Sequence, residues 1–144
     1  GGGDLRLSPL GAGGVRSTAC GGCALGAVSH GEAGGQAMKD IIRQALGSPS
    51  SSWSHPGDID SPLVLGCAYK PPCVQGVLNW YNRQGAGIAP ENVFFFDDKG
   101  SNVRSFYGSH FNAKQVSCAS PDGGKGLCGA SPGEIRLEHG VSTC

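Results

Sequence analysis

The chain has 144 residues, the size of one domain that buries roughly 68–70% of the surface its unfolded form exposes. Its 11 basic and 11 acidic residues balance, so it lacks the positive charge typical of proteins that bind nucleic acids or anionic membranes. No apolar run approaches the ~20 residues that cross a bilayer. The start carries neither a methionine nor a signal-peptide pattern, so we expect a processed product or a fragment.

A glycine-rich segment opens the chain over 1–24, and we expect it to be an irregular arm with a weak core. We expect an α/β domain over 25–130 and a C-terminal tail over 131–144. Within the arm, Cys20 and Cys23 have a spacing used by zinc sites and redox motifs. A disulfide or two free thiols fit that spacing as well, and a structural zinc site would need a histidine and a further cysteine.

Short apolar runs and amphipathic stretches alternate after the arm, with the lengths of buried strands and surface helices. The predicted strands are 25–29, 63–65, 92–96 and 114–118. The predicted helices are 36–46, which ends before Gly47, 70–84 and 102–107. This alternation favours the α/β fold class, with a Rossmann-like parallel sheet and crossover helices.

Seven cysteines are many for a reducing cytosol, and they favour an oxidising compartment such as the secreted space or an organelle lumen. An odd number leaves one thiol free or paired with another chain. Cys67 and Cys73 flank Lys70, and a bridge between them would fix the lysine loop at little closure cost. A bridge between Cys118 and Cys128 would similarly close the loop that separates them.

Polar residues lie at the ends of two predicted strands and directly before one predicted helix. Ser29 ends the first strand, Lys70 comes directly before a helix that opens with two prolines, and Asp97-Asp98 ends the third strand. Open α/β sheets bind ligands at the carboxyl ends of their strands. The same acidic pair also fits a plain strand-to-loop transition, in which Asp98 caps the next helix.

From about Leu25 to Cys118 this order resembles the haloacid dehalogenase (HAD) superfamily, and the segment 90–103 is most similar to that family's fourth motif. The resemblance implies that Ser29 hydrogen-bonds a phosphoryl group and that Lys70 neutralises it. It also implies a magnesium ion held by an acidic pair and an amide, which are Asp97, Asp98 and Asn102. Phosphoryl transfer depends on positioning and charge neutralisation, for which these residue types are suited.

The family's nucleophile is absent from this chain. It is the first aspartate of an Asp-x-Asp at the end of the first strand, whereas the internal Asp58-Ile-Asp60 follows a Ser/Pro loop and lies downstream of Ser29. Asp4 also lacks a preceding apolar strand. Without that carboxylate no aspartyl-phosphate intermediate forms, and magnesium loses one expected ligand.

We therefore expect a non-catalytic or incomplete HAD-like phosphatase domain, a pseudoenzyme that acts as a binding or structural module. One alternative is a magnesium-dependent phosphomonoester hydrolase whose nucleophile segment lies outside this chain. Another is an accessory subunit of a larger assembly that contacts protein partners through its extensions.

Overall fold

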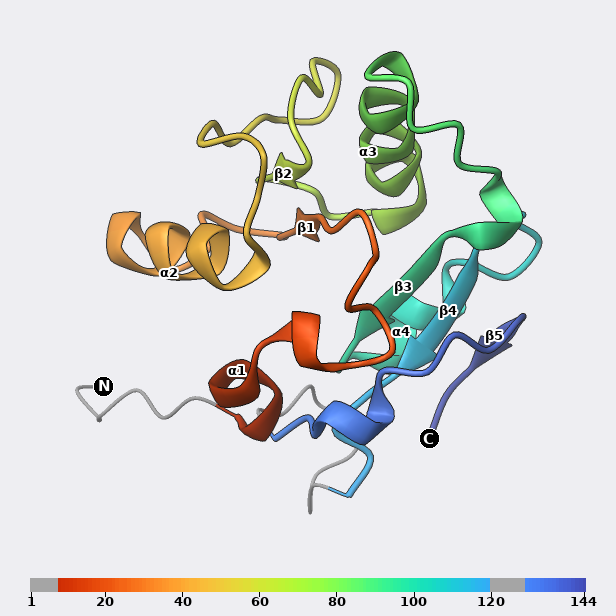
Figure 1. The fold of residues 1–144 in the computed structure, drawn as a ribbon. Coiled ribbons are helices and arrows are strands. Elements are labelled where there is room, and N and C mark those ends of the chain that lie inside the picture. Colours follow the sequence, from red (N-terminus) through yellow and green to blue (C-terminus); the bar gives the residue numbers. More distant parts are fainter. Residues whose placement is uncertain (1–7, 120–128) are drawn as a thin grey trace.

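The computed structural model describes residues 8–119 and 129–144 and has a mixed α/β architecture with two small parallel sheets (Figure 1). In the first sheet, β1 (Ala27–Val28) pairs with β2 (Leu63–Val64). The second has the order β3 (Phe94–Asp97), β4 (Asn112–Gln115) and β5 (Val141–Ser142). The predicted α/β class is confirmed at this level, and the two sheets do not share a hydrogen-bonded strand.

The two longer helices lie on either side of β1 and β2 (Figure 1). α2 (Gln36–Leu46) ends at Gly47, whose φ of 58° is left-handed and suits a residue without a β-carbon. α3 (Lys70–Arg83) begins with two prolines, which need no backbone partner in a first helical turn. Both helices agree with the predicted ranges to within one residue.

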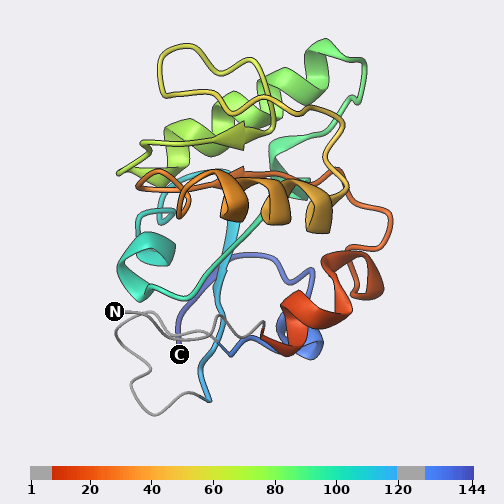
Figure 2. The same ribbon diagram turned by 90° about the vertical axis from the view of Figure 1, so that its left-hand side faces the viewer.

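The shorter elements are α1 (Pro9–Gly13), α4 (Gly100–Arg104) and three 3-10 turns at Val15–Ser17, Pro90–Asn92 and Pro132–Glu134. The arm is therefore less irregular than expected, because the Ser8 hydroxyl accepts a hydrogen bond from Gly11 N at 3.0 Å and caps α1. Figures 1 and 2 both show α1 beside the last 3-10 turn. Leu10 N donates to Ala130 O at 2.9 Å across this contact. No helix of the described ranges is long and apolar enough to cross a membrane.

The four predicted strands and the third predicted helix differ from their predicted boundaries. β1 and β2 are shorter than 25–29 and 63–65, and the other three differ for local reasons. β3 starts later because Pro90–Asn92 form a 3-10 turn before it. β4 starts at Asn112, earlier than predicted, and stops before Ser117, whose φ of 64° takes the chain out of the extended conformation. α4 begins at Gly100 and is N-capped by the Lys99 backbone, not by Asp98.

Aromatic side chains form the main core beneath the second sheet. Phe106 is fully buried, and its ring stacks on that of Phe95 with 4.5 Å between centroids. Phe111 contacts it from the other side at 6.3 Å. Val74 and Leu78 of α3 belong to the same cluster, so α3 packs on both sheets.

Two disulfides cross-link the described residues. Cys67 is bonded to Cys73, as predicted, while the predicted Cys118–Cys128 bridge is wrong because Cys118 is bonded to Cys144. Parallel pairing of β5 with β4 carries the C-terminal residue beside the end of β4, with a Cα–Cα distance of 5.5 Å. Cys128 lies outside the described residues. Two disulfides are compatible with an oxidising compartment.

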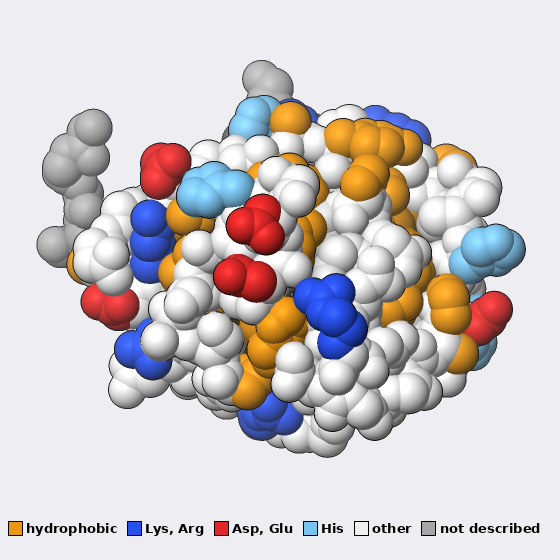
Figure 3. Space-filling model, turned by 90° about the horizontal axis from the view of Figure 1, so that it is seen from above, with side chains coloured by type: hydrophobic (Ala, Val, Ile, Leu, Met, Phe, Trp, Pro, Cys, Tyr) orange, Lys and Arg blue, Asp and Glu red, His pale blue; other side chains and the backbone are white. Residues whose placement is uncertain are grey.

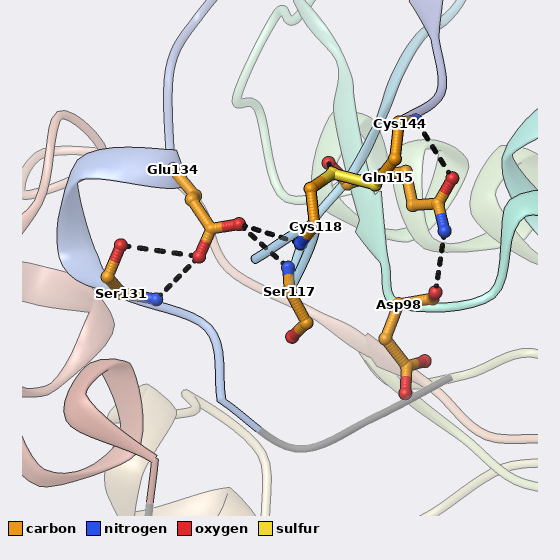
Figure 4. Close-up of a disulfide and its surroundings, with 7 residues drawn as sticks. All are labelled: Asp98, Gln115, Ser117, Cys118, Ser131, Glu134 and Cys144. Atoms are coloured by element: carbon orange, nitrogen blue, oxygen red, sulfur yellow. Dashed lines mark hydrogen bonds between the residues drawn. A yellow bond between two sulfur atoms is a disulfide. The ribbon is translucent and has the colours of Figure 1, made fainter. Parts of the chain in front are cut away.

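Segment 131–144, expected to be a tail, is joined to the sheet by Glu134 (Figure 4). One carboxylate oxygen accepts hydrogen bonds from Ser117 N at 2.7 Å and Cys118 N at 3.4 Å. The other accepts from Ser131 N at 2.7 Å and from the Ser131 hydroxyl at 3.2 Å, completing a capping box. Burial alone would raise the pKa of Glu134, but these four donors outweigh it and hold the pKa below its ordinary value.

Replacing Glu134 with glutamine is expected to lower the free energy of unfolding by about 1–2 kcal/mol at neutral pH, since hydrogen bonds to a charged acceptor are lost. A depressed pKa stabilises the fold above the unfolded-state value of about 4.3, and this contribution disappears as the pH falls through the folded-state pKa. Urea unfolding across that pH range should therefore show the wild-type and Glu134→Gln curves converging in acid. The matched control Glu138→Gln, an exposed carboxylate 3.7 Å from Arg136, should change stability by under ~1 kcal/mol. Equal effects of the two substitutions would contradict this role of Glu134.

Candidate functional site

Ser29 and Lys70 are both hydrogen-bonded to the backbone of one residue, Cys67. Ser29 N donates to Val64 O at 2.9 Å as part of the β1–β2 pairing, and Ser29 O accepts from Cys67 N at 2.9 Å. The carbonyl oxygen of Cys67 accepts a hydrogen bond from Lys70 Nζ at 2.8 Å. The Ser29 hydroxyl has no hydrogen-bond partner in the described part of the chain. The Cys67–Cys73 disulfide closes the segment that carries Lys70, and Ser29 is joined to this segment by its hydrogen bond with Cys67.

Lys70 is a buried cation with only 3% of its surface exposed. An ammonium group has three N–H donors, and one of them is used by Cys67 O. Among residues 8–119 and 129–144, Lys70 makes no ion pair and no further hydrogen bond. Burial lowers the pKa of Lys70, while the nearby Asp97 carboxylate favours its charged form. Buried charges are costly without a partner, so this position suits an anion.

Asp97 leads from β3 into the loop before α4 and is held by two local contacts. Its Oδ1 accepts a hydrogen bond from Lys99 N at 2.7 Å, and its Oδ2 accepts one from Asn102 Nδ2 at 3.0 Å. Asn102 therefore orients Asp97 through its amide nitrogen. The amide oxygen of Asn102 takes no part in this hydrogen bond. The structure brings these two predicted residues together at the carboxyl end of β3.

Asp98 lies against Asp97, and the two carboxyl groups interact directly. Burial raises the pKa of Asp98, and hydrogen bonding with Asp97 and its negative charge raise this pKa further. Gln115 Nε2 donates to Asp98 O at 3.0 Å, and Gln115 Oε1 accepts from Cys144 N at 3.0 Å (Figure 4). The second disulfide is thus linked to the backbone of the acidic pair through one side chain.

Asp97, Asp98 and Asn102 carry oxygen atoms of the types that a hard cation such as Mg²⁺ prefers as ligands. The set is short of ligands, since no group of three or more His, Cys, Asp and Glu side chains in the described ranges could hold a metal ion. Cys20 and Cys23 are free thiols, and in the described ranges they belong to no group of residues that could bind zinc. Burial, together with its contact with Cys23, raises the pKa of Cys20 to about 12, so this thiol is a poor nucleophile at neutral pH.

Sequence reasoning did not foresee an apolar cavity of about 710 Å³ between the two sheets. Residues of β1 line one side of it and residues of β3 the other, and α2 and α3 supply further walls. Asp97 is also a lining residue. No pattern in a single strand predicts such a space, because it arises from how the two sheets are placed.

Charged side chains on the face seen in Figure 3 lie in small separate groups of both signs. This distribution agrees with the balanced composition and gives that face no extended field of one sign. Comparisons with protein-family models, curated proteins and solved structures find no match to the chain.

Proposed function

We propose that this chain is an incomplete HAD-like domain that binds a phosphoryl group together with a divalent cation and does not hydrolyse phosphate esters by itself. In this proposal Ser29 and Lys70 contact the phosphoryl oxygens. Asp97 and Asp98 hold magnesium, with Asn102 orienting Asp97. The resemblance of segment 90–103 to the family's fourth motif supports this assignment of roles.

The observation that carries the proposal is the burial of Lys70 with no direct ion pair in the described part of the chain, since Asp97 acts on it only from a longer range. Its ammonium is anchored by Cys67 O at 2.8 Å and retains free donors. Phosphoryl oxygens accept hydrogen bonds from such donors and also compensate the buried positive charge. The half-buried Ser29, which is linked to Lys70 through the backbone of Cys67, offers a hydroxyl that can donate to the same ligand.

Asp97 and Asp98 would hold magnesium, which would supply positive charge that neutralises the carboxylates and a bound phosphoryl group. The proximity of Asp97 and Asp98 fits this role, because a divalent cation relieves the repulsion between two neighbouring carboxylates. The described residues supply too few acidic ligands for a complete site. This shortage of metal ligands agrees with the absence of the family's nucleophilic aspartate, which would supply one of them.

The alternative of a magnesium-dependent phosphomonoesterase is favoured by one observation, the cavity beside Asp97. A nucleophile segment from outside residues 1–144 could enter there and supply the absent carboxylate. Hydrolysis would then require that segment, whereas phosphate binding by Lys70 would not. The two functions therefore differ in what the 144-residue chain does alone.

Replacing Lys70 with methionine is expected to weaken phosphate binding by about tenfold or more, because a charge-assisted hydrogen bond in a buried site is worth about 1.5–3 kcal/mol. Inorganic phosphate should raise the thermal stability of the wild-type chain in a concentration-dependent way, since a ligand stabilises the state that binds it. Magnesium should strengthen this effect in the wild type and not in Asp98→Asn. Isothermal titration with phosphate, with and without magnesium, measures both quantities.

Lys39→Met provides the matched control, since Lys39 lies on α2 and pairs with Glu32 at 3.5 Å. It should bind phosphate as the wild type does. If Lys70→Met and Lys39→Met bind phosphate equally well, Lys70 has no role in anion binding. If phosphate does not stabilise the wild type at millimolar concentration, the proposed function is wrong.

A further inference from the structure

The cavity separates two strands that each have one unpaired edge. β1 pairs with β2, and the far side of β2 is taken by a parallel bridge between Ser54 and Val64. β3 pairs with β4, and β4 with β5. The free edge of β1 and the free edge of β3 therefore border the cavity, since residues of both strands line it.

The hydrogen-bond register identifies the groups on these two edges. Ala27 N donates to Pro62 O and Ser29 N donates to Val64 O, so the backbone groups of Val28, which lies between them, point away from β2. In β3, Val93 O and Asp97 O accept from β4, and the alternation directs the backbone of Phe94 and Phe96 to the opposite edge.

Such an edge is a template for another strand, because backbone N–H and C=O groups facing an apolar space are costly to leave unpaired. Val28, Phe94 and Phe96 all line the cavity. Peptide recognition by strand addition uses one edge of this kind. Here two edges border the same space.

The carboxyl ends of β1 and β3 are also linked to each other through Lys70. Ser29, at the carboxyl end of β1, is hydrogen-bonded to Cys67 N, and the carbonyl oxygen of Cys67 accepts from Lys70. Lys70 in turn interacts electrostatically with Asp97, at the carboxyl end of β3. Both strands therefore end at one side of the molecule. A strand lying between them in a continuous parallel sheet would end there as well.

Helices cover the cavity above and below. α3 contributes Val74, Val77 and Leu78, and α2 contributes Ile42 and Leu46. A strand buried on both faces is apolar on both faces, as in the centre of parallel sheets. The apolar lining therefore favours a strand whose residues are all apolar over a strand in which apolar and polar residues alternate.

We propose that this cavity binds one apolar β-strand, parallel to β1 and β3 and supplied by polypeptide outside residues 1–144, which joins the two sheets into one. Each strand in the described part of the chain already has a partner on at least one edge, so a second copy could not offer such a strand with both edges free. A small apolar ligand would leave the edge backbone groups unpaired. This inference goes beyond phosphate binding and does not depend on it.

A synthetic peptide with the run Val-Ile-Val-Phe-Val, flanked by two lysines at each end, tests the proposal on the 144-residue chain. Amide hydrogen exchange is measured by NMR with and without the peptide. Exchange of the Val28, Phe94 and Phe96 amides should slow by about tenfold or more, because they gain partners. Exchange of the Ala27 and Phe95 amides, which already have partners, should change much less.

The same peptide with proline at its central valine is the matched control, since proline cannot donate to a ladder and distorts the strand. It should leave the exchange of all five amides unchanged. Equal protection by both peptides, or uniform slowing at paired and unpaired positions, overturns the proposal. Loss of phosphate binding in the experiment above has no bearing on these amides, so the two proposals fail separately.

Cys23 lines the cavity four residues before β1 and reports the strand direction. In a Cys20→Ser/Cys128→Ser background, two versions of the peptide carry an activated cysteine, as the thiopyridine disulfide, either before or after the apolar run. Cys23 displaces thiopyridone and forms a mixed disulfide with the peptide. The version with the amino-terminal cysteine should react several-fold faster, and faster reaction of the other version overturns the parallel arrangement.

Discussion

Replacing Phe106 with alanine is expected to lower the free energy of unfolding by about 3–5 kcal/mol, the usual cost of removing a fully buried aromatic ring. Phe106 has no exposed surface and stacks on Phe95 at 4.5 Å, so the substitution removes a ring from the centre of the main core. Domains of this kind are stable by about 5–15 kcal/mol, so the loss is a large fraction of the total. Urea unfolding followed by tryptophan fluorescence measures it.

The neighbouring Tyr107→Ala is the control for this substitution, because Tyr107 is 63% exposed. It removes a larger side chain and should change stability by within about 0.5 kcal/mol. A loss below about 1 kcal/mol for Phe106→Ala would contradict the packing of α4 on β3. Phe95 lies in the strand that ends at Asp97, so a weakened core should also lower the affinity for phosphate.

Removing the Cys118–Cys144 disulfide by a double serine substitution is expected to cost about 3.5 kcal/mol, from the entropy of closing a loop with a sequence separation of 26. The bond fastens the end of the chain to the end of β4, and β5 has only two residues to hold it otherwise. Thermal and urea unfolding under non-oxidising conditions measure the loss.

The Cys67→Ser/Cys73→Ser variant is the comparison, because its loop has a separation of only 6 and the same relation gives about 2 kcal/mol. It should destabilise the chain less than the first double variant while weakening phosphate binding more, since it frees the loop that holds Lys70. A larger stability loss for the shorter loop would contradict the loop-entropy argument.

The elements that the sequence predicts well are those with a strong local pattern. α2 has apolar residues at helical spacing and a glycine directly after its end, and α3 has prolines in its first turn. The Cys67–Cys73 bond could be predicted because its loop is short. Helix ends and short loops depend on neighbouring residues alone, so one sequence contains enough information to place them.

The features that escaped prediction depend on residues far apart in the chain. The partner of Cys118 is decided by the pairing of β5 with β4, which spacing cannot indicate. Glu134 and Gln115 join the C-terminal segment to the sheet through hydrogen bonds across 17 and 29 residues. At the candidate site, the residue types could be read from the sequence, but the burial of Lys70 depends on the packing around its loop.

The positions of the two disulfides have a mechanical consequence. Cys67–Cys73 lies wholly beside the first sheet and Cys118–Cys144 wholly beside the second, and among the described residues no covalent cross-link spans the space between them. Each disulfide stiffens its own side of the molecule, and the two sides are joined by the chain itself, by the packing of α3 and by apolar contacts such as those around Leu25. Widening the cavity would therefore break no sulfur–sulfur bond, and a strand that entered it as proposed would need no reducing agent.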